Sequence, residues 1–362
     1  ADRASRPVHR QTLYERATFF GFGAPSCGDN VPLVVQYHGR VCLLGEHCDW
    51  AGGSSLTVPL PMSIRLAVED CPQQDHIRMR TAVHGELQEW TWPLAGAVDP
   101  DGGVQRFGPA CTHALHARGI PVRPSTLWVH GSLPAGRGFS SSAAFTLAVL
   151  DGLSRHAGRP LPAEDLAELA YTVEHDLLGV ACGRLDPLAC AAGAPVFLAW
   201  GADGRAPLRR IHLGQPVHLV VGAFPRPRDA RAILDALQRH HAGSLGEATQ
   251  AVHGAVETFA SEAEAGAHAL ANGDLAGLGA SMWRCQDAYD AVASAIPELH
   301  APQLSRVCTA LHARGALGAK FSGAGGDGSI VVLARDQPES VALAALLHDA
   351  GLSVWRVPVL QS

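Results

Sequence analysis

Residues 131–150 read GSLPAGRGFSSSAAFTLAVL and combine glycines, adjacent serines and an apolar run of helical character. Gly136 and Gly138 have no Cβ atoms, so a ligand can approach the backbone and its N–H groups can point inward. The first N–H groups of a helix lack partners within the helix, and the helix dipole favours negative charge there. A phosphate chain therefore suits this loop, although a serine-capped helix after a turn explains the stretch equally well when it is taken alone.

A second group of polar residues follows the apolar segment 41–44, where Glu46, His47 and Asp49 stand close together. Functional side chains are often carried where a buried strand runs into a loop. Carboxylates fixed at such a point can accept hydrogen bonds from substrate hydroxyl groups, and they reject a ligand that leaves them unpaired. Taken alone, a surface loop with polar residues is the simpler explanation.

Three segments, in order along the chain, change that interpretation. They are GRVCLLGEHCDWAGG at 39–53, PAGRGFSSSAA at 134–144 and GAKFSGAGGDG at 318–328. Together they resemble the three motifs of the GHMP small-molecule kinases, and the first is similar to the galactokinase signature, roughly GRVNLIGEHTDYNGG. The resemblance to galactokinase-like sugar 1-kinases covers most of the chain, from about residue 19 to about residue 333.

The resemblance implies an α+β GHMP kinase fold with two domains. An N-terminal ribosomal-S5-like domain is expected over residues 1–203, and a C-terminal ferredoxin-like domain over residues 204–362. A boundary near residue 200 agrees with the apolar segment 194–200, which is followed by the turn-forming residues GADG.

Hydrophobic periodicity and turn signals predict the elements within these domains. Strands are expected at 32–37, 40–44, 56–68, 77–92, 127–130, 194–200, 217–223 and 329–333, and helices at 107–119, 143–153, 162–178, 228–241, 248–272, 275–294 and 303–314. A short amphipathic segment is expected within residues 1–30.

The activity that the resemblance implies is the ATP- and Mg²⁺-dependent phosphorylation of the anomeric (C1) hydroxyl of a monosaccharide. Asp186 would accept the proton of that hydroxyl or stabilise the developing charge, while Arg40 orients Asp186 and steadies the phosphoryl group. Ser142 and Glu174 would hold Mg²⁺, since hard oxygen ligands suit that ion. Among the residues that match the family motifs, those that would bind the sugar are Glu46, His47, Asp49 and Gly183. Those that would bind ATP are Pro134, Gly136, Gly138, Ser140, Ser141, Ser142, Gly323 and Gly325.

Several positions depart from the galactokinase pattern. Tyr37-His38 stands where the family has Ala-Pro, Trp50 where it has Tyr, Asp186-Pro187 where it has Asp-Gln, and Asp327 where it has Gly. These residues lie beside groups expected to touch the sugar or the phosphates, so we expect a sugar other than galactose, from a specialised pathway. The alternatives are an ordinary galactokinase and a non-catalytic sugar-sensing regulator. A decarboxylase of the superfamily should lack the GEHxD motif, which is intact here.

Composition limits other functions. The net charge of −6 gives no reason to expect a nucleic acid or a membrane as partner. The 9 cysteines include no C-x-x-C pair, which argues against a zinc site or a disulfide framework and favours reduced thiols in a cytoplasmic enzyme. No apolar run reaches the length of a membrane span, and the first residues lack the hydrophobic core of a signal peptide. The expected partners are a small sugar and ATP, and the expected assembly is a monomer or homodimer.

Overall fold

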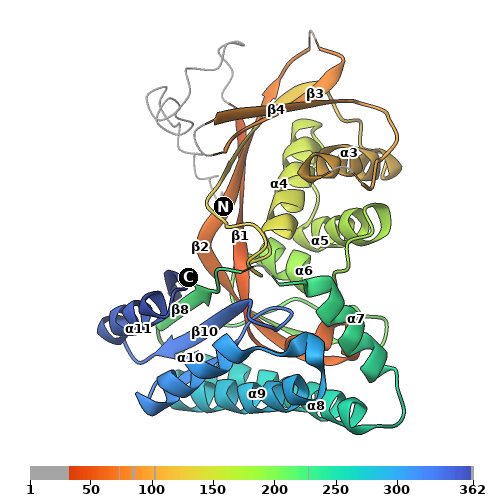
Figure 1. Cartoon of the computed structure of the whole chain (residues 1–362). Coiled ribbons are helices and arrows are strands. Elements are labelled where there is room, and N and C mark those ends of the chain that lie inside the picture. Colours follow the sequence, from red (N-terminus) through yellow and green to blue (C-terminus); the bar gives the residue numbers. More distant parts are fainter. Residues whose placement is uncertain (1–31, 73, 84–85, 102, 227, 360–362) are drawn as a thin grey trace, which may run out of the picture.

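The structure is a computed structural model of the chain, and it describes residues 32–359 apart from 73, 84–85, 102 and 227. The amphipathic segment expected within residues 1–30 lies outside the described residues. Two sheets, each with its own set of helices, are stacked along the long direction of the molecule (Figure 1). Within the described part, no helix is both long enough and apolar enough to cross a membrane.

The first sheet is built around a long antiparallel pair, β1 (Leu33–Leu44) and β2 (Gly53–Asp70). Strand β2 pairs with β6 (Val196–Trp200) through its first half and with β5 (Ser125–Gly131) through its second half. The order across the sheet is β4-β3-β5-β2-β6-β7, with β1 paired to β2 off this path; β3 is His76–Val83, β4 is Glu86–Pro93 and β7 is Arg209–Arg210.

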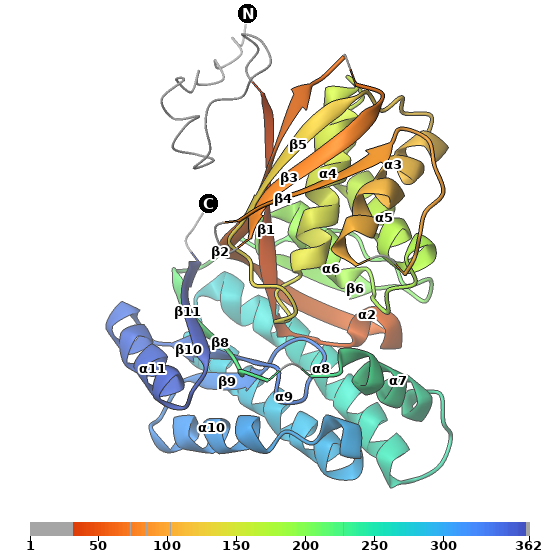
Figure 2. The same ribbon diagram turned by 45° about the horizontal axis from the view of Figure 1, so that its top comes forward.

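Helices cover one face of this sheet (Figures 1 and 2). The central one, α4 (Ser141–His156), packs against β1 and β2. Its residues 146–154 are all buried, as expected of a helix that is apolar on most sides. Around it lie α3 (Phe107–Ala117), α5 (Ala163–Tyr171) and α6 (Leu185–Ala192), and the short elements of this half are α2 (Cys48–Ala51) and η1 (Val104–Arg106).

The second sheet is antiparallel with the order β11-β8-β10-β9, where β8 is Val217–Ala223, β9 is Gly318–Phe321, β10 is Ser329–Ala334 and β11 is Ser353–Val359. Helix α9 (Leu275–Ala295) packs on β9, and α8 (Glu247–Asn272) packs on both α9 and β2, so α8 joins the two halves. The remaining elements are α7 (Ala230–His241), η3 (Pro297–Leu299), α10 (Pro302–Ala313) and α11 (Gln337–Asp349).

The predicted α+β class is confirmed, and the element boundaries differ from the prediction in informative places. The segment 40–44, expected as the continuation of the strand at 32–37 or as the next strand, is its continuation: both belong to β1, with an irregular register between His38 and Arg40. The helix expected at 162–178 is α-helical only to Tyr171 and continues as the π-helical turn η2 (Thr172–Leu177). Helices α6 and α11 and strand β11 are absent from the prediction.

Asp327, the acidic substitution in the third motif, caps a helix. Its carboxylate accepts hydrogen bonds from the backbone N–H groups of Gln303 (3.0 Å) and Leu304 (2.9 Å), at the start of α10. The residue before α10, Ala301, supplies no side-chain cap. Asp327 therefore takes that role from a distant part of the chain, and the helix dipole favours its negative charge.

We predict that Asp327→Ala lowers the free energy of unfolding by about 1 kcal/mol, because two N–H groups at the start of α10 lose their acceptor. Asp327→Asn, which keeps one acceptor oxygen, should lose less. Chemical denaturation of the wild type and both variants measures the difference. Weaker nucleotide binding by Asp327→Ala at unchanged stability would contradict the capping role.

Candidate functional site

A cleft of about 340 Å³ brings together residues that are far apart in the sequence. Its walls come from β1 and the loop after it, the segment leading into α6, helix α7 and the glycine-rich loop after β9. This volume falls at the lower end of the range for small-molecule sites, about 300–1,000 Å³. Its charged and polar lining includes Arg40, Glu46, His47, Asp49, Asp186 and Arg228.

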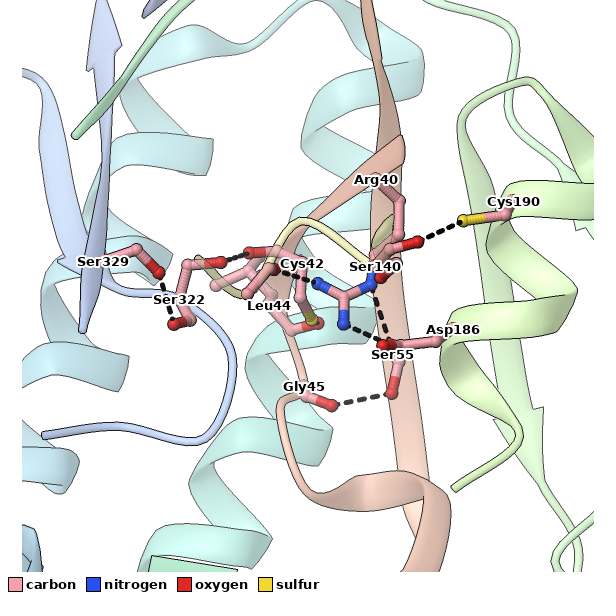
Figure 3. Close-up of polar contacts among 11 residues, drawn as sticks. Arg40, Cys42, Leu44, Gly45, Ser55, Ser140, Asp186, Cys190, Ser322 and Ser329 are labelled. Atoms are coloured by element: carbon pink, nitrogen blue, oxygen red, sulfur yellow. Dashed lines mark hydrogen bonds and ion pairs between the residues drawn. The ribbon is translucent and has the colours of Figure 1, made fainter. Parts of the chain in front are cut away.

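Arg40 and Asp186 form an ion pair inside the cleft, as Figure 3 shows. Arg40 Nε donates to Asp186 Oδ1 at 3.0 Å, and Nη2 donates to the same oxygen. Arg40 Nη1 donates to the carbonyl oxygen of Gly138 at 3.1 Å, so one guanidinium joins β1, α6 and the loop before α4. Burial opposes the charge, but the Asp186 carboxylate raises the pKa of Arg40. The two residues predicted to be catalytic thus lie in contact.

The loop 134–142 has the geometry of an anion cradle. Gly136 and Gly138 have φ angles of 70° and 74°, a region that side chains avoid. Ser140, at the N-terminus of α4, also has a positive φ of 59°, and its buried hydroxyl has no partner among the described residues. No side chain caps α4 at Ser140, so its first N–H groups are available to a ligand. An oxyanion would satisfy both the hydroxyl and these N–H groups.

The loop of the third motif lies against this cradle, and Arg228 lies between the two. A Cβ atom added to Gly323 would come 2.9 Å from Arg228 Nη2 and 3.7 Å from the Cα of Gly138. Arg228 Nη1 donates to the carbonyl oxygen of Gly325, and no carboxylate pairs with Arg228 among the described residues. Burial lowers the pKa of Arg228 to about 10, so the guanidinium stays charged at neutral pH. A positive charge without a carboxylate partner suits a phosphate.

Arg228 is absent from the sequence prediction. It stands between Arg226 and Arg231 in a segment, FPRPRDAR, where several arginines alternate with other residues. The sequence pattern does not indicate which of these arginines lies at the cleft. Arg228 reaches the cleft because β8, which precedes it, pairs with β10 next to the third motif, and this pairing is not evident from the sequence.

Glu174 reaches the interior because the helix widens into the π-helical turn η2, a feature often found at functional sites. Its side chain is buried, and its Oε1 accepts a hydrogen bond from the Thr146 hydroxyl at 3.1 Å. Burial raises the pKa of Glu174 to about 7, while hydrogen bonds from Ser142 and Thr146 act in the opposite direction. A buried carboxylate of this kind gains from a nearby cation.

The Ser142–Glu174 pair fits a Mg²⁺ site that is completed by phosphates. No cluster of three or more His, Cys, Asp or Glu suitable for a metal occurs in the part of the chain that the structure describes. Mg²⁺ in phosphoryl-transfer enzymes is usually held by one or two carboxylates together with substrate phosphates and water. One carboxylate and one hydroxyl beside the loop 134–142 meet that requirement.

The residues predicted to bind the sugar line the same cleft. Glu46 and His47 are buried, and Asp49 and Gly183 are partly buried. A Cβ atom on Gly183 would lie 1.7 Å from Asp49 Oδ2, so only glycine allows this approach. Burial raises the pKa of Asp49 to about 6, and the neighbouring Asp186 adds to the rise. Asp49 and Asp186 therefore lie near each other in the lining of the cleft.

Helix α7 forms a wall of the cleft that the sequence does not predict. Leu234 and Gln238 line the cleft beside Trp50. The Trp50 ring contacts His47 and His241 edge-on, with ring centroids 5.7 Å and 5.5 Å away. The buried Nε1 of Trp50 has no hydrogen-bond partner among the described residues.

The other departures from the galactokinase pattern lie outside the cleft lining. The Tyr37 hydroxyl donates to Asp151 of α4 at 2.9 Å, and the His38 ring contacts the Leu60 carbonyl oxygen at 2.9 Å. Pro187 is buried in the first turn of α6, where the N–H group that proline lacks would have no helical partner. Trp50 is thus the departure from the pattern that lines the cleft.

Models of known protein families match three parts of the chain. Residues 107–194 match the family described as GHMP kinases N terminal domain, residues 267–349 match GHMP kinases C terminal, and residues 25–70 match the galactokinase galactose-binding signature. The chain is 30% identical to a galactokinase of Thermotoga neapolitana over 167 residues, 44% of either protein. It is 27% identical to a mevalonate kinase of Aeropyrum pernix over 312 residues, 82% of this chain and 87% of that one.

Solved structures share the fold at low sequence identity. The Lactococcus lactis galactokinase complexed with galactose superposes with a TM-score of 0.73 and 19% identity, covering 97% of each chain. The Methanococcus jannaschii mevalonate kinase gives a TM-score of 0.72 and 16% identity, covering 92% of this chain and 100% of that one. The alignment with the Thermotoga galactokinase spans less than half of its length, 44%, so that relative's activity is not transferred as a whole. The ordered motifs, the family matches and the shared fold identify the chain as a member of the GHMP kinase superfamily with a galactokinase-like sugar-binding signature.

Proposed function

We propose that the protein is an ATP- and Mg²⁺-dependent kinase that phosphorylates the anomeric (C1) hydroxyl of a monosaccharide. The observation that carries this proposal is the Arg40–Asp186 ion pair, which lies between the anion cradle and the carboxylate of Asp49. A carboxylate next to a cation, with a phosphate site on one side and hydroxyl acceptors on the other, suits transfer of a phosphoryl group to an alcohol.

Each residue of the pair has a defined task in this reaction. Asp186 accepts the proton of the attacking hydroxyl or stabilises the charge that develops on its oxygen. Arg40 holds Asp186 through one oxygen and is tied to the Gly138 carbonyl, so the base keeps a fixed position relative to the phosphate loop. Its positive charge also favours the negative charge on the transferred group.

The nucleotide would be held by the loop 134–142 and by the third-motif loop around Gly323 and Gly325. The Ser140 hydroxyl and the first N–H groups of α4 donate to phosphate oxygens, and Arg228 adds a cation from the opposite side. Ser142 and Glu174 would hold Mg²⁺, which when bound neutralises phosphate charge. Phosphoryl transfer depends mainly on such positioning and charge stabilisation.

The sugar would bind through Glu46, His47, Asp49 and Gly183, and we propose that it is a sugar other than galactose. Trp50 supports this choice because it lines the cleft at the position of the family's smaller tyrosine. The alternatives are an ordinary galactokinase and a regulator that binds sugar without turnover. Arg40, Ser142, Glu174 and Asp186 are all present, which argues against the regulator.

ADP release from ATP and Mg²⁺, measured with a panel of substrates, tests the proposal. The panel should contain galactose, other hexoses, pentoses, heptoses, a uronic acid and mevalonate, with a chelator as the metal-free control. Phosphorus NMR of the product identifies a phosphate on C1. A protein that phosphorylates only mevalonate, or no member of the panel, would refute the proposed activity. A kcat/KM on galactose of about 10⁴ M⁻¹s⁻¹ or more, unmatched by any other sugar, would identify an ordinary galactokinase.

Asp186→Asn should lower turnover by about 10²–10⁴-fold with little change in ATP binding, because the amide cannot take up the proton. Asp151→Asn is a matched control: Asp151 is likewise an arginine-paired carboxylate of the same half, but it is buried and lies outside the cleft lining. Steady-state kinetics and nucleotide titration compare the two. Retention of more than about a third of the wild-type kcat by Asp186→Asn would exclude a proton-accepting role of the size cited.

Gly183→Ala should raise the KM for the sugar more than the KM for ATP, since its methyl group would displace the Asp49 carboxylate that lies 1.7 Å from the added Cβ. Gly254→Ala is the control, because a Cβ at Gly254 in α8 meets nothing within 4 Å. Kinetic constants for both substrates, with thermal unfolding as a check on folding, give the result. Equal changes in both KM values would mean that Asp49 does not contact the sugar.

A further inference from the structure

Lys320 is the only lysine in the sequence, and it is fully buried. It lies in β9 of the second sheet, and its ammonium contacts Glu46, which follows β1 of the first sheet. Lys320 Nζ donates to Glu46 Oε1 and, at 2.7 Å, to the carbonyl oxygen of Phe321. A lysine is rarely buried without a charged partner, so the pairing accounts for its presence there.

The second carboxylate oxygen of Glu46 has a different environment. Oε2 is buried and has no hydrogen-bond partner among the described residues, although the side chain lines the cleft. A buried acceptor left without a donor is costly. A sugar hydroxyl can supply that donor, which would leave Oε1 on the ammonium and Oε2 on the ligand.

We infer that Lys320 is a positioning residue, which keeps Glu46 ionised and leaves its Oε2 as the acceptor for a sugar hydroxyl. The inference rests on the proposed function and adds a residue from the third motif to the sugar site. Because ammonium and carboxylate neutralise each other, the pair selects a neutral hydroxyl donor over a cationic amino group.

The position of Lys320 is itself fixed by the second half of the molecule. The Phe321 N–H donates to Gln286 Oε1 of α9 at 2.7 Å, and Ser322 Oγ donates to the Cys42 carbonyl oxygen of β1 at 3.5 Å. The same short segment continues into the loop that contains Gly323 and Gly325. The end of β9 therefore acts on both parts of the site. It positions the Glu46 carboxylate through Lys320, and it continues into the loop at the phosphate site.

The charge state of Glu46 gives this inference a pH signature. Burial raises the pKa of Glu46, and Lys320 is the main group that opposes the rise, with Arg40 acting in the same direction. The other ionisable groups that interact with Glu46 are the thiols of Cys42, Cys48 and Cys285, whose pKa values are all raised by burial. Without the ammonium, the Glu46 carboxyl binds a proton at higher pH than in the wild type and loses its acceptor role.

Lys320→Met tests the inference, because Met is similar in length and carries no charge. We expect the KM for the sugar to rise about tenfold or more, with little change in the KM for ATP. The wild-type kcat/KM for the sugar should itself rise with pH, because burial raises the pKa values of the site carboxylates Asp49 and Glu174. Because the ionised Glu46 carboxylate is the binding form, this rise should extend to higher pH in Lys320→Met than in the wild type. Lys320→Arg, which keeps the cation, should restore part of the affinity.

Gln286→Met is the matched control, since it removes a separate buried hydrogen bond to β9 and leaves the Glu46 contact in place. The same selective loss of sugar affinity in Gln286→Met would show a general effect of β9 on the site and would overturn the inference. An unchanged sugar KM in Lys320→Met, or a reduced affinity with the same pH dependence as in the wild type, would also overturn the inference.

If Lys320→Met fails to fold, the Glu46→Gln/Lys320→Met double variant removes both charges together. Its sugar affinity should equal that of Glu46→Gln, and a further loss would overturn the inference.

A spectroscopic measurement on the unaltered protein is independent of turnover. Labelling with nitrogen-15 lysine gives a single side-chain signal, because the chain has one lysine. Saturation with the sugar that the substrate panel identifies should shift this signal, while an unshifted signal would overturn the inference. The two failures can be told apart. If the proposed function is wrong, the wild type phosphorylates no sugar. If only this inference is wrong, the protein is an active sugar kinase whose sugar affinity does not depend on Lys320.

Discussion

The ion pair between Arg40 and Asp186 is the contact on which the site depends. Taking two charges out of water costs more than their attraction returns unless the geometry is good and further hydrogen bonds are made. Arg40 meets this condition with its contacts to Asp186 and to the Gly138 carbonyl. Strand β1, helix α6 and the loop before α4 must therefore keep their relative positions, and the cleft forms where these elements converge.

Close backbone approach is the second constraint, and it explains why the motifs are rich in glycine. A Cβ on Gly39 would come 2.5 Å from the Phe139 carbonyl oxygen, and one on Gly183 would meet the Asp49 carboxylate. At Gly323 the added atom would meet Arg228. The glycines thus bring charged side chains together at distances that larger residues would prevent, and they leave a charged but narrow cleft for a small ligand.

The sequence predicts the parts of this arrangement that are encoded locally. Periodicity predicts strand β8 and helix α8 almost to the residue, because their apolar patterns are long and uninterrupted. It does not predict α6, whose first turn contains Pro187 and which is held by tertiary packing. The motifs predict Arg40, Asp49 and Asp186, which the fold brings into one cleft, whereas the wall formed by α7 arises only from packing.

The contacts of the residues that depart from the galactokinase pattern distinguish Trp50 from the others. All of these residues stand beside motif residues in the sequence, yet Tyr37 turns toward α4 and Pro187 is buried in α6. Trp50 alone among them lines the cleft, together with residues of α7 such as Gln238. A choice between sugars must be made by groups that touch them, because an unpaired polar contact discriminates more strongly than a change of shape nearby. For the proposed sugar substrate, selection therefore depends on Trp50 and the residues of α7 that line the cleft, a feature that the motifs do not encode.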